Sequence, residues 1–355
     1  MATLFSPLAR YEPGIVNRLR DNNFDALRLI FASMVVVFHI GVLSQAASLA
    51  WCLHISATFA VQAFFVVSGF LVTMSFEHSS SIKSYASKRV RRIMPAYIVV
   101  IVAAALILSA LSVLPWSAYF TSRELWRYLG FNLILSNFSA PTLPGVFESN
   151  FITAINGSLW TIKIEVAFYC LVPFMVWATR RFGAKKVLST VFVASILWKI
   201  GFNIAAAATG AEIYAKLAKQ LPGQLCFFAG GAWAYYHTRE GKSISGAVAA
   251  VGAIVYATSS GGWFNDLTAP LAVTAVVYWA AIAGPRLPAV AKHGDFSYGV
   301  YLYHFPLVQT FIALGTFRWS PLAGWMASVT VVGVSAVLSW KLVERPTLHR
   351  SVAHS

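Results

Sequence analysis

The chain has 355 residues, of which 58% are hydrophobic and 11% charged, and it carries 12 Trp, 14 Tyr and 26 Phe. This composition excludes an ordinary soluble globular protein and indicates a chain that lies in a bilayer. The net charge of +15 needs no nucleic-acid partner, because most lysines and arginines fall in loops expected on one side of the membrane.

Residues 1–23 are polar, contain Pro and Gly, and lack the short apolar core and small-residue cleavage pattern of a signal peptide. We therefore predict a cytoplasmic tail over 1–23, a single transmembrane domain over 24–343 and a second cytoplasmic tail over 344–355. The three cysteines are scattered and have no spacing typical of a metal site, so we expect neither a metal nor a disulfide.

Apolar runs long enough to cross roughly 30 Å of hydrocarbon predict an all-α integral membrane protein with about ten transmembrane helices. A shorter amphipathic stretch at 124–138 is too short to span, and it is predicted to be interfacial or re-entrant. The predicted spans lie at 24–47, 51–76, 95–115, 158–179, 187–209, 221–237, 245–260, 268–284, 296–316 and 321–343.

The loops between these spans predict the orientation of the chain. With the N-terminus inside, nineteen of the 27 lysines and arginines fall on the cytoplasmic side and five on the opposite side. The positive-inside rule then predicts that both termini are cytoplasmic, in a multi-pass protein of the inner (plasma) membrane.

The first predicted span carries two ionisable residues, Arg28 near its start and His39 near its end. A spacing of 11 residues puts them about 20° apart around a helix and roughly 16 Å apart along it. Ionisable groups inside a span are costly unless they face a polar interior, so this shared face indicates a functional path. Asp25 is a candidate partner for the guanidinium. The structural alternative is an arginine that reaches the lipid headgroups and a histidine hydrogen-bonded within the bundle.

The second predicted span closes with FFVVSGFL at 64–71, in which the small residues Ser68 and Gly69 lie between aromatic residues. Small residues let the backbone of another helix approach closely. Packing alone can explain this stretch.

The stretch SKRVRRIMPAY places Arg89, Arg91 and Arg92 directly before the third predicted span, with Pro95 near the first turn of that span. These arginines can simply set the topology of the chain. Alternatively, they form a phosphate clamp, because arginine offers bidentate hydrogen bonds to phosphate oxygens.

Two later spans also contain ionisable residues. Glu165 enters the fourth predicted span at a depth of about 10 Å from its outer end. Its partner is expected on another helix, because Lys163 points to a different side. In the ninth span His304 lies two residues before Pro306, whose ring frees a backbone carbonyl in the preceding turn. The alternative for Glu165 is a purely structural ion pair or hydrogen bond. The alternative for His304 is a helix kink lined by polar groups.

Counting 1.5 Å per residue from the cytoplasmic surface gives approximate depths for these residues. Arg28 comes to roughly 6 Å, His304 to roughly 12 Å, Glu165 to about 20 Å and His39 to about 22 Å. The count therefore predicts that His39 and Glu165 meet near the outer leaflet, above a basic inner mouth.

These stretches together resemble the membrane-bound acyltransferase-3 family, which acylates sugars on surface glycans, lipid-linked saccharides and some secondary metabolites. The resemblance covers roughly residues 22–346, and its order of motifs is specific although each motif alone is weak. The motifs are FDALR with the Arg28–His39 spacing, FFVVSGF at 64–70, R-x-x-R-I-x-P-x-Y from Arg89 to Tyr97, SLWTIKIEVAFY around Glu165, FSYGVYLYHFP around His304 and ERP at 344–346.

The resemblance implies an acyl-coenzyme A donor from the cytoplasm, most commonly acetyl-coenzyme A, and a carbohydrate or glycoside acceptor. It implies His39 as the central catalytic residue, and a neutral imidazole can act as base or nucleophile. Glu165, which could orient the imidazole and stabilise its protonated form, and His304 are our further catalytic candidates. The expected donor-binding residues are Arg28, Arg89, Arg92 and Ser68.

A different class of function remains open from the sequence, namely a proton-coupled transporter or flippase for a lipid-linked or small polar substrate. Its hallmark, a repeat of the hydropathy of the first half in the second half, is not evident. Partners beyond the donor, the acceptor and membrane lipids are not predicted. The oligomeric state is open, with a homodimer among the alternatives.

Overall fold

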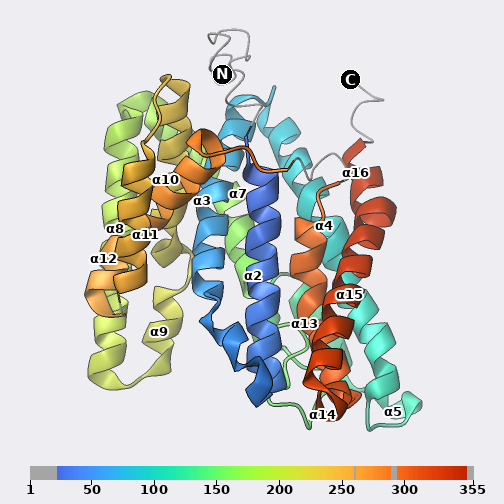
Figure 1. Ribbon diagram of the computed structural model, residues 1–355. Coiled ribbons are helices and arrows are strands. Elements are labelled where there is room, and N and C mark those ends of the chain that lie inside the picture. Colours follow the sequence, from blue (N-terminus) through green and yellow to red (C-terminus); the bar gives the residue numbers. More distant parts are fainter. Residues whose placement is uncertain (1–21, 260, 289–293, 350–355) are drawn as a thin grey trace. The chain divides into compact units, whose positions relative to one another are not determined.

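The computed structural model describes residues 22–259, 261–288 and 294–349, and all regular structure in these ranges is helical (Figure 1). The predicted all-α class is confirmed. Each of the ten predicted ranges contains a helix, but the count of ten spans is not confirmed. By length and hydropathy, the segments of the described chain that can cross a membrane are seven: Phe24–Ser44, Ala47–Glu77, Ile82–Leu111, Trp160–Phe182, Ala184–Thr209, Gly262–Ala283 and Pro321–Leu348. Most of the two predicted tails, residues 1–21 and 350–355, lies outside the described residues.

The described residues form two compact units, and several helices contribute to both. The first unit comprises 22–28, 61–86, 164–259 and 261–288, with most of α3 (Ala57–Glu77) and α7 (Trp160–Phe182) and with α8 (Ala184–Thr209), α9 (Glu212–Ala218), α10 (Leu221–Arg239), α11 (Gly246–Thr258) and α12 (Gly262–Tyr278). The second comprises 29–60, 87–163 and 294–349, with most of α2 (Phe24–Ser44) and α4 (Ile82–Ile107) and with α5 (Trp116–Thr121), α6 (Arg123–Leu133), α13 (Ser297–Ala313), α14 (Thr316–Trp319), α15 (Pro321–Ser339) and α16 (Arg345–His349).

Two glycines let α3 and α10 touch along their backbones in the first unit. A Cβ atom at Gly69 would lie 2.0 Å from the carbonyl oxygen of Phe228, and one at Gly231 would lie 1.9 Å from that of Val66. No side chain fits in either place, because these distances are far below van der Waals contact. The close approach predicted from the FFVVSGFL stretch is therefore confirmed for Gly69.

Prolines inside three helices each leave a carbonyl without its helical partner, and a side chain from elsewhere in the same unit donates to that oxygen. Asn156 donates to Leu302, four residues before Pro306, at 2.9 Å. The hydroxyl of Tyr85 donates to Tyr169 at 3.0 Å, opposite Pro173, and that of Thr347 to Arg91 at 3.5 Å, opposite Pro95. Such replacement donors are what makes proline tolerable in a membrane helix.

The predicted start of the third span is wrong. Helix α4 begins at Ile82, so Arg89, Arg91 and Arg92 lie inside the helix and Pro95 lies well past its first turn. The Ser81 hydroxyl accepts a hydrogen bond from the amide of Ser84, which caps the new start. A hydropathy window detects only the apolar part of such a helix, while the Ala, Lys and Arg residues before it are equally good helix formers.

The amphipathic stretch predicted at 124–138 forms α6, which ends at Leu133, followed by a short turn at Asn137–Ser139. Ser122 caps the helix by accepting from the amide of Glu124 at 3.1 Å. With 11 residues the helix is too short to span, as predicted, while its interfacial or re-entrant position stays a prediction.

The core of the second unit joins α2 to α13 and α15. A Cβ atom at Gly299 of α13 would lie 2.8 Å from the Cα atom of Ala336 of α15, so these helices also touch by their backbones (Figure 1). This packing fixes the position of α13 against α2. The buried residues of the cluster are Val36, Ile40, Leu43, Leu49, Cys52, Phe305, Val308, Phe317 and Val332.

Candidate functional site

Two histidines that are far apart in the sequence meet in the second unit, His39 of α2 and His304 of α13. The Nδ1 atom of His39 lies 2.9 Å from the Nε2 atom of His304, and the rings stack with their centroids 5.0 Å apart. Phe305 packs edge-on against the His39 ring. His304 is fully buried, whereas His39 keeps part of its surface accessible. The buried ring of His304 thus holds the partly accessible ring of His39 in place.

The hydrogen bonds of His304 determine which nitrogen of His39 can react. The Nδ1 atom of His304 lies 2.7 Å from the carbonyl oxygen of Tyr301, which can only accept, so Nδ1 carries a proton. In the neutral ring Nε2 is then an acceptor, and the Nδ1 atom of His39 must donate to it. The bare nitrogen of His39 is therefore Nε2.

The predicted difference in depth between the two histidines, about 10 Å by the count of residues, is wrong. That count assumed that every span begins at the same surface. Asp295, just before α13, forms an ion pair with Arg92, which lies ten residues into α4, or roughly 15 Å from its start. The start of α13 therefore lies level with the interior of α4 and not with its start. His304 consequently reaches the height of His39.

The segment that precedes α7 holds α13 in register at His304. The Asn156 side chain donates to Leu302 and accepts from both the amide and the hydroxyl of Ser158. The Thr161 and Tyr301 hydroxyls lie 2.7 Å apart. Asn156 and Gly157 directly precede the motif SLWTIKIEVAFY, in which the sequence indicated a role only for Glu165. The carbonyl that Pro306 frees was a signal that a donor such as Asn156 was needed.

A cavity of about 520 Å³ lies in the second unit beyond the C-terminal end of α2. Its walls include Leu43, one turn after His39, and a set of polar residues. Gln45 has a left-handed backbone with φ of 52°, an unusual conformation for a residue with a side chain. The polar residues of the walls are Ser44, Gln45, Ser48, Ser149, Asn150 and Arg318.

Arg92 lies in an ion-pair cluster that the sequence did not predict. Its guanidinium contacts Asp295 at 2.6 Å and Glu344 at 3.3 Å, and it lies over the ring of Tyr298. The two carboxylates also accept from the hydroxyls of Ser297 and Ser339. The Arg92 side chain is only 14% exposed. The cluster connects the interior of α4 to the start of α13 and to the helical turn at Trp340–Glu344 that follows α15.

The other predicted site residues are Arg28 of α2, Ser68 of α3, Arg89 of α4 and Glu165 of α7. Glu165, in the first unit, accepts from the hydroxyl of Tyr169 one turn later on α7, and its expected partner on another helix stays a prediction. Ser68 is buried in α3, and no hydrogen bond to its hydroxyl is found within the described residues. Arg28 lies on the same continuous helix as His39. The meeting of Glu165 with His39 stays a prediction.

In the part of the chain that the structure describes, no group of three His, Cys, Asp or Glu side chains could hold a metal ion. The partly accessible ring of His39 can offer acid–base chemistry. A neutral imidazole held by a neutral neighbour has the ordinary features of a general base or nucleophile.

Comparison with known proteins assigns the chain to a family. The profile of the acyltransferase-domain family matches residues 21–343. Nodulation protein 10 of Rhizobium leguminosarum bv. viciae is 30% identical over 367 residues, which cover 92% of this chain and 93% of the relative. An O-acetyl transferase of Shigella phage Sf6 is 29% identical over 339 residues, which cover 94% and 97%. No solved structure matches the chain.

The family profile covers nearly all of the chain, including the Arg28–His39 motif and the segment around His304. The described residues supply several helices that can cross a membrane, as a multi-pass protein requires. The chain therefore belongs to the acyltransferase-3 family and is a membrane acyltransferase.

Proposed function

We propose that the chain moves an acyl group, acetyl in the first instance, from acyl-coenzyme A on the cytoplasmic side of the inner (plasma) membrane to a hydroxyl of a saccharide or glycoside. The similarity to an O-acetyl transferase supports oxygen as the accepting atom. The family assignment favours this enzyme over a transporter or flippase. The observation that carries the proposal is the accessible His39 ring, whose Nδ1 atom is hydrogen-bonded to buried His304.

In the proposed reaction the Nε2 atom of His39 takes the proton of the acceptor hydroxyl as its oxygen attacks the carbonyl carbon of the thioester. The carbon–sulfur bond breaks, and the coenzyme A thiolate leaves and takes the proton from Nε2. His304 keeps the ring oriented through Nδ1 and accepts the stronger hydrogen bond that the imidazolium donates. Glu165 is proposed to steady the same positive charge.

A covalent route uses the same nitrogen. Here Nε2 attacks the thioester first, and the acyl group passes from the acyl-histidine to the acceptor. The two routes differ in one measurable way. Only the covalent route releases one equivalent of coenzyme A per enzyme before acceptor is added.

We propose that the acceptor occupies the polar cavity beside the end of α2. Leu43 in its wall is one helical turn, roughly 6 Å, from His39. Hydroxyl and amide side chains such as Ser44 and Gln45 match the hydrogen-bonding groups of a sugar. Phe151, which is 65% exposed and also lines the cavity, offers an apolar surface to a sugar ring.

The donor is proposed to enter from the cytoplasmic side, where its phosphates would contact Arg28, Arg89 and Arg92, with Ser68 nearer the pantetheine arm. Two carboxylates already neutralise Arg92. Its proposed contact with the donor therefore requires an exchange of partners. A homodimer remains a proposal without a structural argument.

The test is the release of coenzyme A thiol from acetyl-coenzyme A by membranes that contain the full chain, with a total glycan extract of the host as acceptor. We expect His39→Ala to lower the specific activity by roughly 10²- to 10⁴-fold, the usual cost of losing a general base. His54→Ala is the matched control, because His54 is an exposed histidine of the same unit. Activity of His39→Ala above about a tenth of wild type would exclude His39 as base or nucleophile.

The acceptor is tested separately by mass spectrometry of surface polysaccharide and small glycosides from cells with and without the gene. A mass increase equal to one acyl group is expected only in cells with the gene. If wild-type membranes release coenzyme A while no glycan or glycoside gains mass, the saccharide acceptor is wrong and the acyl transfer stands.

A further inference from the structure

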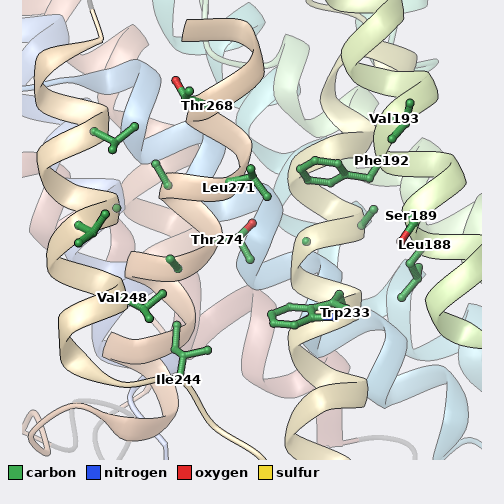
Figure 2. A pocket seen from close by; sticks show the side chains of 17 residues that line it. Leu188, Ser189, Phe192, Val193, Trp233, Ile244, Val248, Thr268, Leu271 and Thr274 are labelled. Atoms are coloured by element: carbon green, nitrogen blue, oxygen red, sulfur yellow. The ribbon is translucent and has the colours of Figure 1, made fainter. Parts of the chain in front are cut away.

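The first unit contains an apolar cavity of about 600 Å³ between α8, α10, α11 and α12. Figure 2 shows Phe192 and Leu188 of α8 on one side of it and Leu271 and Val248, of α12 and α11, on the other. Small residues leave the space open. The contributors are Ala229 and Gly230 of α10, Gly252 of α11, and Ala272 and Ala275 of α12.

The lining of this cavity fits a hydrocarbon chain and excludes a sugar or a nucleotide. Among the described residues that line it none is charged, and the hydroxyls of Ser189, Thr268 and Thr274 are separated by aliphatic side chains. Two of the four helices, α8 and α12, lie in segments long and apolar enough to cross a membrane. An apolar space at the depth of the bilayer is filled most favourably by the alkyl chains of the surrounding lipid.

The two ends of the cavity differ in charge. Ile244 and Trp233 lie at one end and Thr268 at the opposite end (Figure 2). Lys242 precedes Ile244 by two residues, and Lys185 and Lys186 precede Ser189 by about one turn of α8. All three lysines are exposed, and among the described residues only Lys242 has an ion pair with an acidic side chain, Glu240 at 2.6 Å.

At the opposite end the nearby charges cancel each other. Lys199 and Asp266 form a buried ion pair at 3.2 Å, and Asn203 donates to the same carboxylate. The first end also has the indole of Trp233 stacked on His237. Tryptophan at the boundary between headgroups and hydrocarbon is typical of membrane proteins. The headgroup of a bound lipid therefore belongs at the end with the lysines.

We propose that this cavity binds one acyl chain of an anionic phospholipid, whose phosphate lies beside Lys185, Lys186 and Lys242. Basic groups at the mouth of a cleft between membrane helices are a recurring way of holding anionic lipid. The site lies within the first unit and does not depend on the proposed acyl transfer. A lipid held there would join α11 to α8, because both helices line the cavity.

The chain-binding part is tested by native mass spectrometry of the full-length protein, exchanged from detergent into nanodiscs of equal parts phosphatidylglycerol and phosphatidylcholine. Val251→Trp fills the cavity from α11. Ile254→Trp is the matched control, because Ile254 is on the same helix and equally exposed (62% against 60%) but does not line the cavity. We expect Val251→Trp to lower the retained phosphatidylglycerol tenfold or more and Ile254→Trp to leave it unchanged. Equal retention in both variants would overturn the proposal.

The headgroup part is tested with Lys185→Gln, Lys186→Gln and Lys242→Gln combined. Removing three charges is expected to lower the preference for phosphatidylglycerol over phosphatidylcholine by about tenfold or more. The double variant Lys216→Gln and Lys219→Gln, on exposed lysines beyond the other end of α8, should keep the wild-type preference. The anionic headgroup is refuted if the wild type retains both lipids equally, or if the triple variant keeps the wild-type preference.

Discussion

His304 offers the sharpest test of the proposed site, because its proposed role is to orient His39 and not to react itself. In His304→Ala the Nδ1 atom of His39 loses its acceptor at 2.9 Å. A neutral hydrogen bond contributes about 0.5–1.5 kcal/mol, which is up to about tenfold in rate. A displacement of the freed ring by about 1 Å lowers the rate further, by as much as roughly 10²-fold. We therefore expect kcat to fall by about 10²-fold while KM for acetyl-coenzyme A stays unchanged.

His304→Gln should restore part of the activity, because the amide oxygen of glutamine can accept from Nδ1 of His39 where Nε2 of His304 did. The assay is again release of coenzyme A thiol by membranes, normalised to the amount of inserted protein. Normalisation matters because His304 is fully buried, and truncating such a side chain typically costs about 2–5 kcal/mol of stability.

Two results would refute this reasoning. If His304→Ala keeps the wild-type kcat, then His304 does not orient the base. If His304→Ala and His304→Gln lose activity equally and in proportion to their abundance, then His304 is only a packing residue.

Three further predictions concern the donor, the acid and the helix contacts. Arg89→Ala should raise KM for acetyl-coenzyme A by about tenfold, since a charge-assisted hydrogen bond is worth about 1.5–3 kcal/mol. Arg92→Ala should mainly lower the abundance of the protein, because it removes the cation between two carboxylates at a cost of about 3–5 kcal/mol. Equal effects of the two variants on KM in enzyme assays would contradict this distinction. Glu165→Gln keeps the shape of the side chain and should lower kcat at constant KM, and unchanged kcat would make Glu165 structural. Gly231→Ala should lower abundance on immunoblots, because its Cβ would lie 1.9 Å from a carbonyl oxygen, while Gly333→Ala, with nothing within 4 Å, should not.

The helical class and the positions of the helices could be predicted from the sequence, because apolar length and hydropathy are local properties. The boundaries could not. Helix α4 begins thirteen residues before its predicted start, at Ile82 instead of residue 95, since a polar stretch of helix leaves no mark on hydropathy. The sequence also predicted a close helix contact at Gly69, but it did not identify α10 as the helix that makes this contact.

The residues of the candidate site were predicted one at a time, and the contact between His39 and His304 was not predicted. His39 and His304 were each marked by an ionisable ring in an apolar run, but 265 residues separate them and no periodicity connects them. The depth count misplaced them because it gave α13 a start at the membrane surface. Glu344 contained the missing signal. A carboxylate at the end of an apolar span needs a cation, and Arg92 supplies it.

The motif FSYGVYLYHFP then acquires a physical meaning beyond its histidine. Tyr298 donates to the carbonyl of Ile93 on α4, Gly299 allows backbone contact with α15, and Tyr301 offers the carbonyl that sets the tautomer of His304. Pro306 leaves an oxygen to which Asn156 donates. Most of the motif thus serves to hold α13 at one height and one rotation. A shift of α13 by one residue would turn His304 away from His39 by about 100°, so these scaffold residues are as necessary to the proposed acyl transfer as the nitrogen that performs it.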